Sequence, residues 1–124
     1  MGETEILVVE DEADTLNLAK IILETEGYKI QTASDGQETF KKIDQRKPDL
    51  ILLDIRLPDI DGYEICRKLK GRSETETIPI VMFSASGSES AKKRALEAGA
   101  DDFLGKPFAM AQLLGVVKRH LGER

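Results

Sequence analysis

The hydrophobic positions of this chain form five short runs, and longer stretches with helical spacing separate them. The runs occupy residues 5–9, 28–33, 50–54, 78–83 and 101–105. The first, third and fourth are almost continuously apolar, which is typical of short strands buried on both faces of a sheet. The run at 28–33 alternates loosely, as an edge strand does, and the run at 101–105 predicts a weak fifth strand.

Between these runs, apolar residues recur at three- and four-residue intervals, which predicts amphipathic helices. We expect helices over 14–26, between the turn at 34–36 and Lys47-Pro48, over about 62–70, over about 88–98, and from about 110 to 121. Gly27 followed by Tyr28 is typical of a helix C-terminus. The residues expected to face the core are Leu16, Ala19, Ile22, Leu23, Phe40, Ile43, Ala91, Ala95, Leu96, Met110, Leu113, Leu114, Val117 and Leu121.

Regular alternation of strands with helices predicts a parallel sheet covered by helices on both faces, a three-layer α/β sandwich with right-handed crossovers. A length of 124 residues fits one domain. The last predicted helix ends just before Arg124, so we expect a single domain over 1–124 with no output domain.

Composition narrows the possible functions. No apolar run approaches the roughly 20 residues that span a bilayer, and the acidic start shows no export or lipidation signal. The net charge of −5 argues against direct nucleic-acid binding. The single cysteine, Cys66, is expected to be a small buried hydrophobic residue, and the lack of a disulfide framework favours a cytoplasmic location.

Charged and hydroxyl side chains stand where the predicted strands end. In a parallel sheet the carboxyl ends of the strands share one edge, where ligands bind. This rule brings together Glu10, Asp11, Asp54, Ser84 and Lys106, although they are far apart in the sequence. A carboxylate at the rim of an apolar core, as expected for Asp54, requires a partner or a cation.

These residue types are suited to phosphoryl transfer. Neighbouring carboxylates repel one another, and Mg²⁺ is the hard cation that best offsets such repulsion, because the set contains no thiolate or imidazole that would favour zinc. A hydroxyl (Ser84) and an ammonium (Lys106) suit the oxygens of a phosphoryl group. The set therefore indicates phosphoryl transfer to an aspartate, with Asp54 as the acceptor.

The motifs that contain these residues closely resemble those of the receiver domain of two-component response regulators, of the chemotaxis-regulator type, over nearly the whole chain. They are Val8-Val9-Glu10-Asp11-Glu12, Leu52-Leu53-Asp54-Ile55-Arg56-Leu57-Pro58 with Asp61-Gly62, Phe83-Ser84-Ala85, Ala98-Gly99-Ala100-Asp101-Asp102-Phe103-Leu104 and Lys106-Pro107-Phe108. The resemblance implies a flavodoxin-like strand order 2-1-3-4-5. It also implies a signalling protein that catalyses only its own phosphotransfer and dephosphorylation.

By this resemblance, Asp54 accepts phosphate from a histidine kinase or a phosphotransfer protein. Mg²⁺ is bound by Asp11, Asp54 and the backbone carbonyl of Arg56, with Glu10 acting through water. Ser84 and Lys106 hold the phosphoryl group, and the Lys106-Pro107 bond is expected to be cis.

The resemblance further implies a conformational switch in which Ser84 moves toward the phosphate and Phe103 turns inward. The surface of the fourth helix, fifth strand and fifth helix then changes and controls a downstream protein whose identity the sequence does not reveal. Ser84 and Phe103 stand where Thr and Tyr are commoner in the family. Arg56 and Ser86 occupy positions that tune the phosphoaspartate lifetime.

Two other classes of protein fit these residues less well than a receiver does. A phosphatase of the dehalogenase type needs a second Asp two residues after the acceptor, where Arg56 stands, and a flavodoxin-like cofactor carrier needs a phosphate loop where Glu10-Asp11-Glu12 would repel phosphate. A receiver that signals by binding alone is a third alternative.

His120 is expected to have a surface role near a helix C-terminus. Lys92-Lys93-Arg94 is expected to be a solvated helix face or the rim of a docking surface.

Overall fold

The computed structural model describes residues 3–85 and 88–122, in which five strands alternate with five helices. In chain order they are β1 (Glu5–Val9), α1 (Ala13–Thr25), β2 (Lys29–Ala33), α2 (Gly36–Gln45), β3 (Leu50–Asp54), α3 (Gly62–Lys70), β4 (Ile80–Ser84), α4 (Glu89–Glu97), β5 (Asp102–Gly105) and α5 (Met110–Leu121). The five predicted strands are confirmed. β4 begins two residues later than expected, since Pro79 has no amide N–H to add to the ladder.

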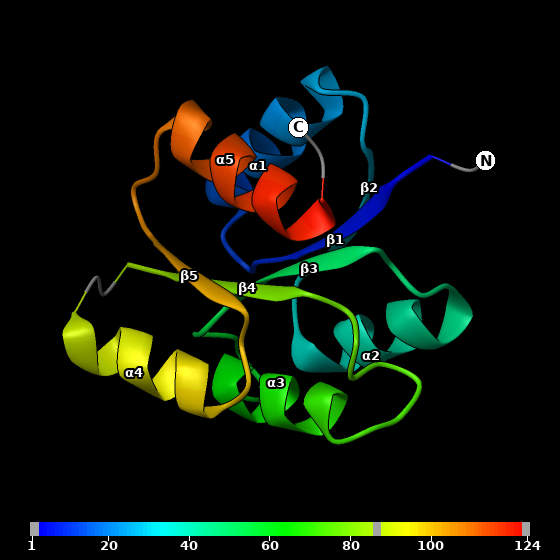
Figure 1. Ribbon diagram of the computed structural model, residues 1–124, viewed down its shortest axis with the longest axis vertical. Helices are drawn as coiled ribbons and strands as arrows, with labels where there is room; N and C mark the ends of the chain where they lie inside the picture. Colours follow the sequence, from blue (N-terminus) through cyan, green and yellow to red (C-terminus); the bar gives the residue numbers. More distant parts are fainter. Residues whose placement is uncertain (1–2, 86–87, 123–124) are drawn as a thin grey trace.

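All strands are parallel, in the order β2-β1-β3-β4-β5. Helices α1 and α5 cover one face of the sheet, and α2, α3 and α4 cover the other (Figure 1). This confirms the three-layer α/β sandwich with flavodoxin-like order. In the part of the chain that the structure describes, every helix is too short or too polar to cross a membrane.

The central strands divide their side chains between two hydrophobic cores. In β3, Ile51 and Leu53 join the core under α2, α3 and α4, whereas Leu50 and Leu52 join the core under α1 and α5. Successive strand residues point to opposite faces, so a strand between two helical layers must be apolar throughout. Asp54, the last residue of β3, is therefore held in place by a strand that is buried along its whole length.

Local signals in the sequence fix the helix ends. The side chains of Glu12, Asp35, Asp61 and Ser88 accept hydrogen bonds from the first turns of α1, α2, α3 and α4, which satisfies amides that have no partner within the helix. Gly27 has φ of 93°, which confirms the predicted helix-terminating glycine after α1.

Two of the residues expected in the core are exposed. Leu96 is 47% exposed and Met110 is 58% exposed. The inner face of α4 is formed by the smaller Ala91 and Ala95, and Leu96, one residue beyond Ala95, is turned by about 100° to the outer face. Met110 is the first residue of α5 and precedes the part of the helix that packs on the sheet, where Leu113 and Val117 are buried.

Asp102 links β5 to α5. Its Oδ2 lies 2.8 Å from His120 Nε2 and accepts a hydrogen bond from Arg119 Nη1 at 2.9 Å. Burial acts to raise the pKa of Asp102, but hydrogen bonds from His120 and from the Phe103 amide outweigh it, so the pKa lies below its ordinary value. His120 is thus a partly buried partner of this carboxylate.

Gly62 permits a close approach between α3 and the end of β3. A Cβ atom there would lie 2.2 Å from the backbone oxygen of Asp54 and 2.9 Å from the Cα of Ile55. Because backbone atoms cannot yield as a flexible side chain can, we expect Gly62→Ala to lower the free energy of unfolding by about 2–3 kcal/mol. Urea denaturation followed by circular dichroism measures the change.

Gly115 is the matched control for this substitution. It lies in the exposed part of α5, and a Cβ atom there would meet nothing within 4 Å. We expect Gly115→Ala to raise the free energy of unfolding by about 0.5–1 kcal/mol, since alanine loses less backbone entropy in a helix. Equal effects of the two substitutions would contradict the close approach at Gly62.

Candidate functional site

Strand register gathers the predicted site residues at one edge of the sheet. Asp54 pairs with Phe83 of β4, and Ser84 pairs with Gly105 of β5. β1 ends at Val9, beside Leu53, so the residue after β1 reaches the same level as Asp54. The site therefore forms at the carboxyl ends of four strands, as the sequence predicts.

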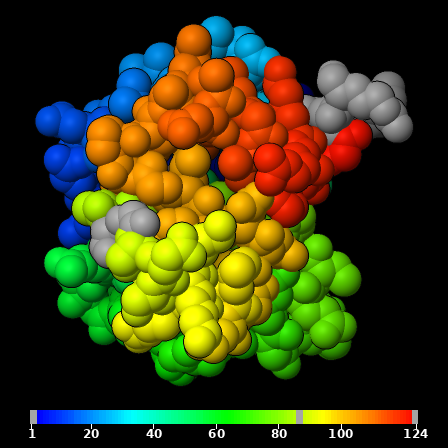
Figure 2. Space-filling view, turned by 60° about the vertical axis from the view of Figure 1, so that its left-hand side comes forward, coloured from blue at the N-terminus to red at the C-terminus, as the bar shows by residue number. Residues whose placement is uncertain are grey.

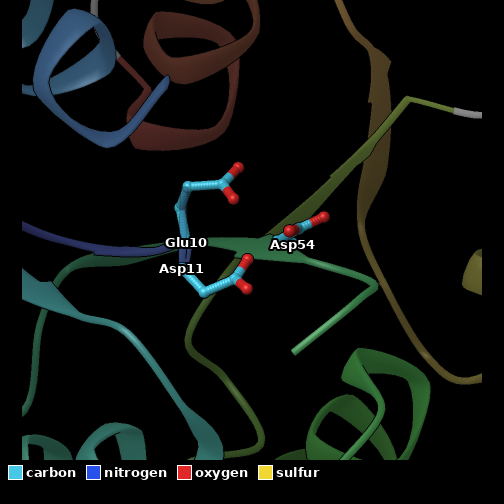
Figure 3. A group of neighbouring side chains, drawn as sticks. All are labelled: Glu10, Asp11 and Asp54. Carbon is cyan, nitrogen blue, oxygen red and sulfur yellow. The ribbon is translucent and has the colours of Figure 1, made fainter. Parts of the chain in front are cut away.

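Three carboxylates meet at this edge (Figure 3). Glu10 and Asp54 are 1% and 4% exposed, whereas Asp11 is exposed. One oxygen from each carboxylate lies within 4.8 Å of the other two. Two of the three negative charges are thus removed from bulk water. Their mutual repulsion is only weakly screened in the protein interior.

Lys106 supplies the opposite charge. Its Nζ donates a hydrogen bond to Glu10 Oε1 at 2.5 Å and lies 3.4 Å from Asp54 Oδ1. Burial, with help from the nearby Asp54 carboxylate, raises the pKa of Glu10 above its ordinary value, although the hydrogen bonds from Lys106 and the Glu12 amide act in the opposite sense. The ammonium therefore bridges the strand ends of β1 and β3.

The remaining predicted residues surround this cluster. Ser84 is 4% exposed at the end of β4, and its carbonyl accepts a hydrogen bond from the Lys106 amide at 2.8 Å. The Arg56 amide lies 3.4 Å from Asp54 Oδ1. Phe103 is half-buried and packs against the core under α2, α3 and α4. Ser86 lies outside the described residues.

The structure adds two contacts that sequence reasoning missed. The Phe83 ring lies beneath Lys106, with the ring centroid 4.7 Å from Nζ, and the Glu12 amide donates to Glu10 Oε2 at 3.0 Å. Phe83 directly precedes Ser84 and Glu12 follows Asp11, so proximity in sequence to the predicted site was the available signal. The Lys106-Pro107 peptide bond is cis, as expected.

The carboxylate cluster fits Mg²⁺ by the chemistry of its donors. Mg²⁺ prefers oxygen ligands and is usually bound by one or two carboxylates together with waters and substrate phosphates. Glu10, Asp11 and Asp54 offer such oxygens, and Asp11 keeps the cluster open to solvent. None of the three offers a sulfur or nitrogen ligand that would favour a softer metal.

Comparison with known proteins agrees with the resemblance seen in the sequence motifs. Residues 6–118 match the family described as "Response regulator receiver domain". The chain is 44% identical over 117 residues to the phosphate regulon transcriptional regulatory protein PhoB of Rhizobium meliloti, covering 94% of this chain and 52% of that protein. It is 45% identical over 114 residues to the alkaline phosphatase synthesis transcriptional regulatory protein PhoP of Bacillus subtilis, covering 92% and 47%. The chain thus spans about half the length of these relatives.

Solved structures agree in fold along the whole chain. A response regulator structure from Chloroflexus aurantiacus superposes with a TM-score of 0.95 at 35% identity, covering 98% of this chain and 100% of that one. The receiver domain of a sensor histidine kinase from Pseudomonas aeruginosa superposes with a TM-score of 0.90 at 30% identity, covering 98% and 100%, and that structure has a magnesium ion coordinated in its active-site cleft. This chain therefore belongs to the response regulator receiver domains of two-component signalling, which are not conventional enzymes.

Proposed function

We propose that this chain is a phosphorylation-dependent switch that accepts a phosphoryl group on Asp54 from a histidine kinase or a phosphotransfer protein. The observation that carries the proposal is the position of Asp54, a nearly buried carboxylate beside two further carboxylates and within 3.4 Å of the Lys106 ammonium. We infer a single receiver domain over 1–124 that acts in the cytoplasm. The two regulatory relatives are named as transcriptional regulators, but they are about twice as long, so the downstream partner of this chain stays open.

In the proposed reaction, one oxygen of the Asp54 carboxylate attacks the phosphorus of the donor. The bond between phosphorus and the donor nitrogen breaks, and the donor imidazole, which carries a proton on its other ring nitrogen, leaves uncharged with the electron pair. Asp54 needs no base because its carboxylate is the nucleophile. The ammonium of Lys106 would exchange part of its pairing with Glu10 and Asp54 for a phosphoryl oxygen, and the Ser84 hydroxyl would donate to another.

Glu10, Asp11, Asp54 and the backbone carbonyl of Arg56 are the groups that we assign to Mg²⁺. A bound Mg²⁺ would supply positive charge to the phosphoryl oxygens as they approach Asp54. Without it, two nearly buried carboxylates would repel an incoming phosphoryl dianion, and Lys106 alone would have to offset that repulsion.

We further propose that phosphorylation changes the surface formed by α4, β5 and α5. These elements lie side by side on one face of the molecule (Figure 2). Ser84 ends the strand that leads toward α4, and Phe103 lies in β5 next to Met82 of β4. A shift of Ser84 toward a phosphoryl group would disturb the packing around Phe103 and so bias two arrangements of this face.

Metal dependence tests the proposed reaction. With acetyl phosphate as donor and MgCl₂ present, intact mass spectrometry is expected to show a gain equal to one phosphoryl group. With EDTA in place of MgCl₂, we expect the rate to fall by about a hundredfold or more, since each such electrostatic contribution to a charged transition state is worth about 10²–10³. Equal phosphorylation in MgCl₂ and EDTA would overturn the assignment of the carboxylates to Mg²⁺.

A further inference from the structure

A cavity of about 250 Å³ lies close to Asp54, between the loop after β3 and helix α4. Arg56 and Ser84, which adjoin Asp54, form one side of it, and Tyr63, Ser90 and Arg94 contribute to the rest. The cavity is much larger than the roughly 30 Å³ that one water occupies in the liquid, so there is room for a small organic ion.

The lining of this cavity is cationic. Of the described residues that line it, Arg56 and Arg94 are basic and none is acidic. Glu10 and Asp11, which lie beside Asp54 and do not line the cavity, are anionic. Asp54 therefore has near it one region suited to a cation and another suited to an anion.

The side chain of Arg94 is held toward this cavity by stacking. Its guanidinium carbon lies 4.2 Å from the centroid of the Tyr63 ring, which favours a cation over the ring face. The ring itself is fixed, because Tyr63 is 4% exposed and its hydroxyl donates to the Ala91 carbonyl at 3.3 Å. Arg94 is thus more than part of the solvated face predicted for Lys92-Lys93-Arg94.

The start of α4 adds positive potential to the same cavity. Ser88 caps this helix and lines the cavity with Ser90. The N-terminal end of a helix carries a partial positive charge, which favours a nearby anion. Two arginines, a helix start and serine hydroxyls therefore surround the same cavity.

We infer that this cavity binds the leaving group of small acyl phosphates and thereby favours phosphodonors whose leaving group is an anion. The inference rests on the proposed phosphorylation of Asp54. Because Arg56 and Ser84 belong both to the rim of Asp54 and to the cavity, a donor whose phosphorus faces the Asp54 carboxylate would have its leaving group at the cavity. Guanidinium groups are well suited to hold a carboxylate with paired hydrogen bonds.

The chemistry of the leaving group separates two kinds of donor. When Asp54 attacks acetyl phosphate, an O–P bond forms, the P–O bond to the acetyl group breaks, and acetate leaves with the electron pair and a full negative charge. When Asp54 attacks phosphoramidate in the form protonated on nitrogen, an O–P bond forms, the P–N bond breaks, and ammonia leaves uncharged with the electron pair. Neither reaction needs a proton transfer. The two arginines would stabilise the charge that develops only in the first reaction.

The test compares acetyl phosphate with phosphoramidate as donors to the whole chain in MgCl₂, with phosphorylation rates measured by intact mass at donor concentrations below saturation. We expect Arg94→Gln to lower the acetyl phosphate rate about tenfold, the contribution of one charge-assisted hydrogen bond, and to leave the phosphoramidate rate within about twofold. Arg94→Lys, which keeps the charge, should retain most of the wild-type preference.

A charge-matched control separates the cavity from long-range effects of charge. Arg67→Gln, at an exposed position on α3, changes the net charge by the same amount and should change neither rate. Equal slowing of both donors by Arg94→Gln, or no slowing of either, would overturn the inference. If neither donor phosphorylated the wild-type chain, the proposed function itself would fail, and the inference with it.

Discussion

Asp54→Asn is expected to gain no phosphoryl mass from acetyl phosphate and Mg²⁺ over a period in which the wild-type chain is fully phosphorylated. A neutral amide is a far poorer nucleophile than a carboxylate, and the change also removes one oxygen from the proposed Mg²⁺ ligands. Loss of a nucleophile typically lowers a rate by about 10³ or more. Intact mass spectrometry over a time course measures the difference.

The control for this change is Asp44→Asn. Asp44 is exposed near the end of α2, and its contact with Arg72 is long, at 4.0 Å. This variant makes the same chemical change outside the site and should be phosphorylated at the wild-type rate. Normal phosphorylation of Asp54→Asn would show that another residue accepts the phosphoryl group.

Lys106→Met is expected to have two opposite effects. The phosphorylation rate should fall by about a hundredfold, because the ammonium that would bind a phosphoryl oxygen is lost. Mg²⁺ should nevertheless bind roughly tenfold more tightly, since the positive charge that now pairs with Glu10 and Asp54 competes with the metal ion for these carboxylates. A variant that is slower yet binds metal better is not expected from a simple loss of structure.

Calorimetric titration measures the second effect, which suits a chain that contains no tryptophan to report on the site. Lys68→Met, in the exposed last turn of α3, is the matched control and should leave both the rate and the affinity unchanged. Weaker Mg²⁺ binding by Lys106→Met would contradict a competition between the ammonium and the metal ion.

The sequence predicts the fold, and the meeting of these side chains at one edge of the sheet, because both follow from short-range rules. Apolar runs that end in Glu10-Asp11, Asp54 and Ser84 specify strands and strand ends, and parallel pairing then aligns those ends with little freedom. The pairing of Asp54 with Phe83 brings Ser84 to the same edge of the sheet as Asp54, as the strand-end rule requires.

Features set by packing between helices were not predictable in the same way. Helical periodicity correctly placed Ala95 inward, but it also placed Leu96 inward, whereas Leu96 is exposed. The contact of Tyr63 with Ala91, and the stacking of Arg94 on Tyr63, depend on the distance and angle between α3 and α4. That geometry is set by the whole core and not by local sequence.

Charge pairing within the site was likewise not predictable from local sequence. Sequence reasoning assigned Lys106 to the phosphoryl group, and it did not show that the ammonium also pairs with Glu10 at 2.5 Å. Lys106 and Glu10 are 96 residues apart in the sequence and meet only in the folded chain, so no local pattern predicts their pairing. It also explains why Glu10 can be buried almost completely next to Asp54.

The most direct test of the central claim locates the phosphoryl group on the chain. Phosphorylated protein is reduced with borohydride, which converts an aspartyl phosphate to homoserine, and the peptides are sequenced by tandem mass spectrometry. We expect homoserine in place of Asp54 only after treatment with a phosphodonor and Mg²⁺, with Asp11 unmodified. Homoserine at another position, or a phosphoryl group that survives reduction on a serine, would contradict it.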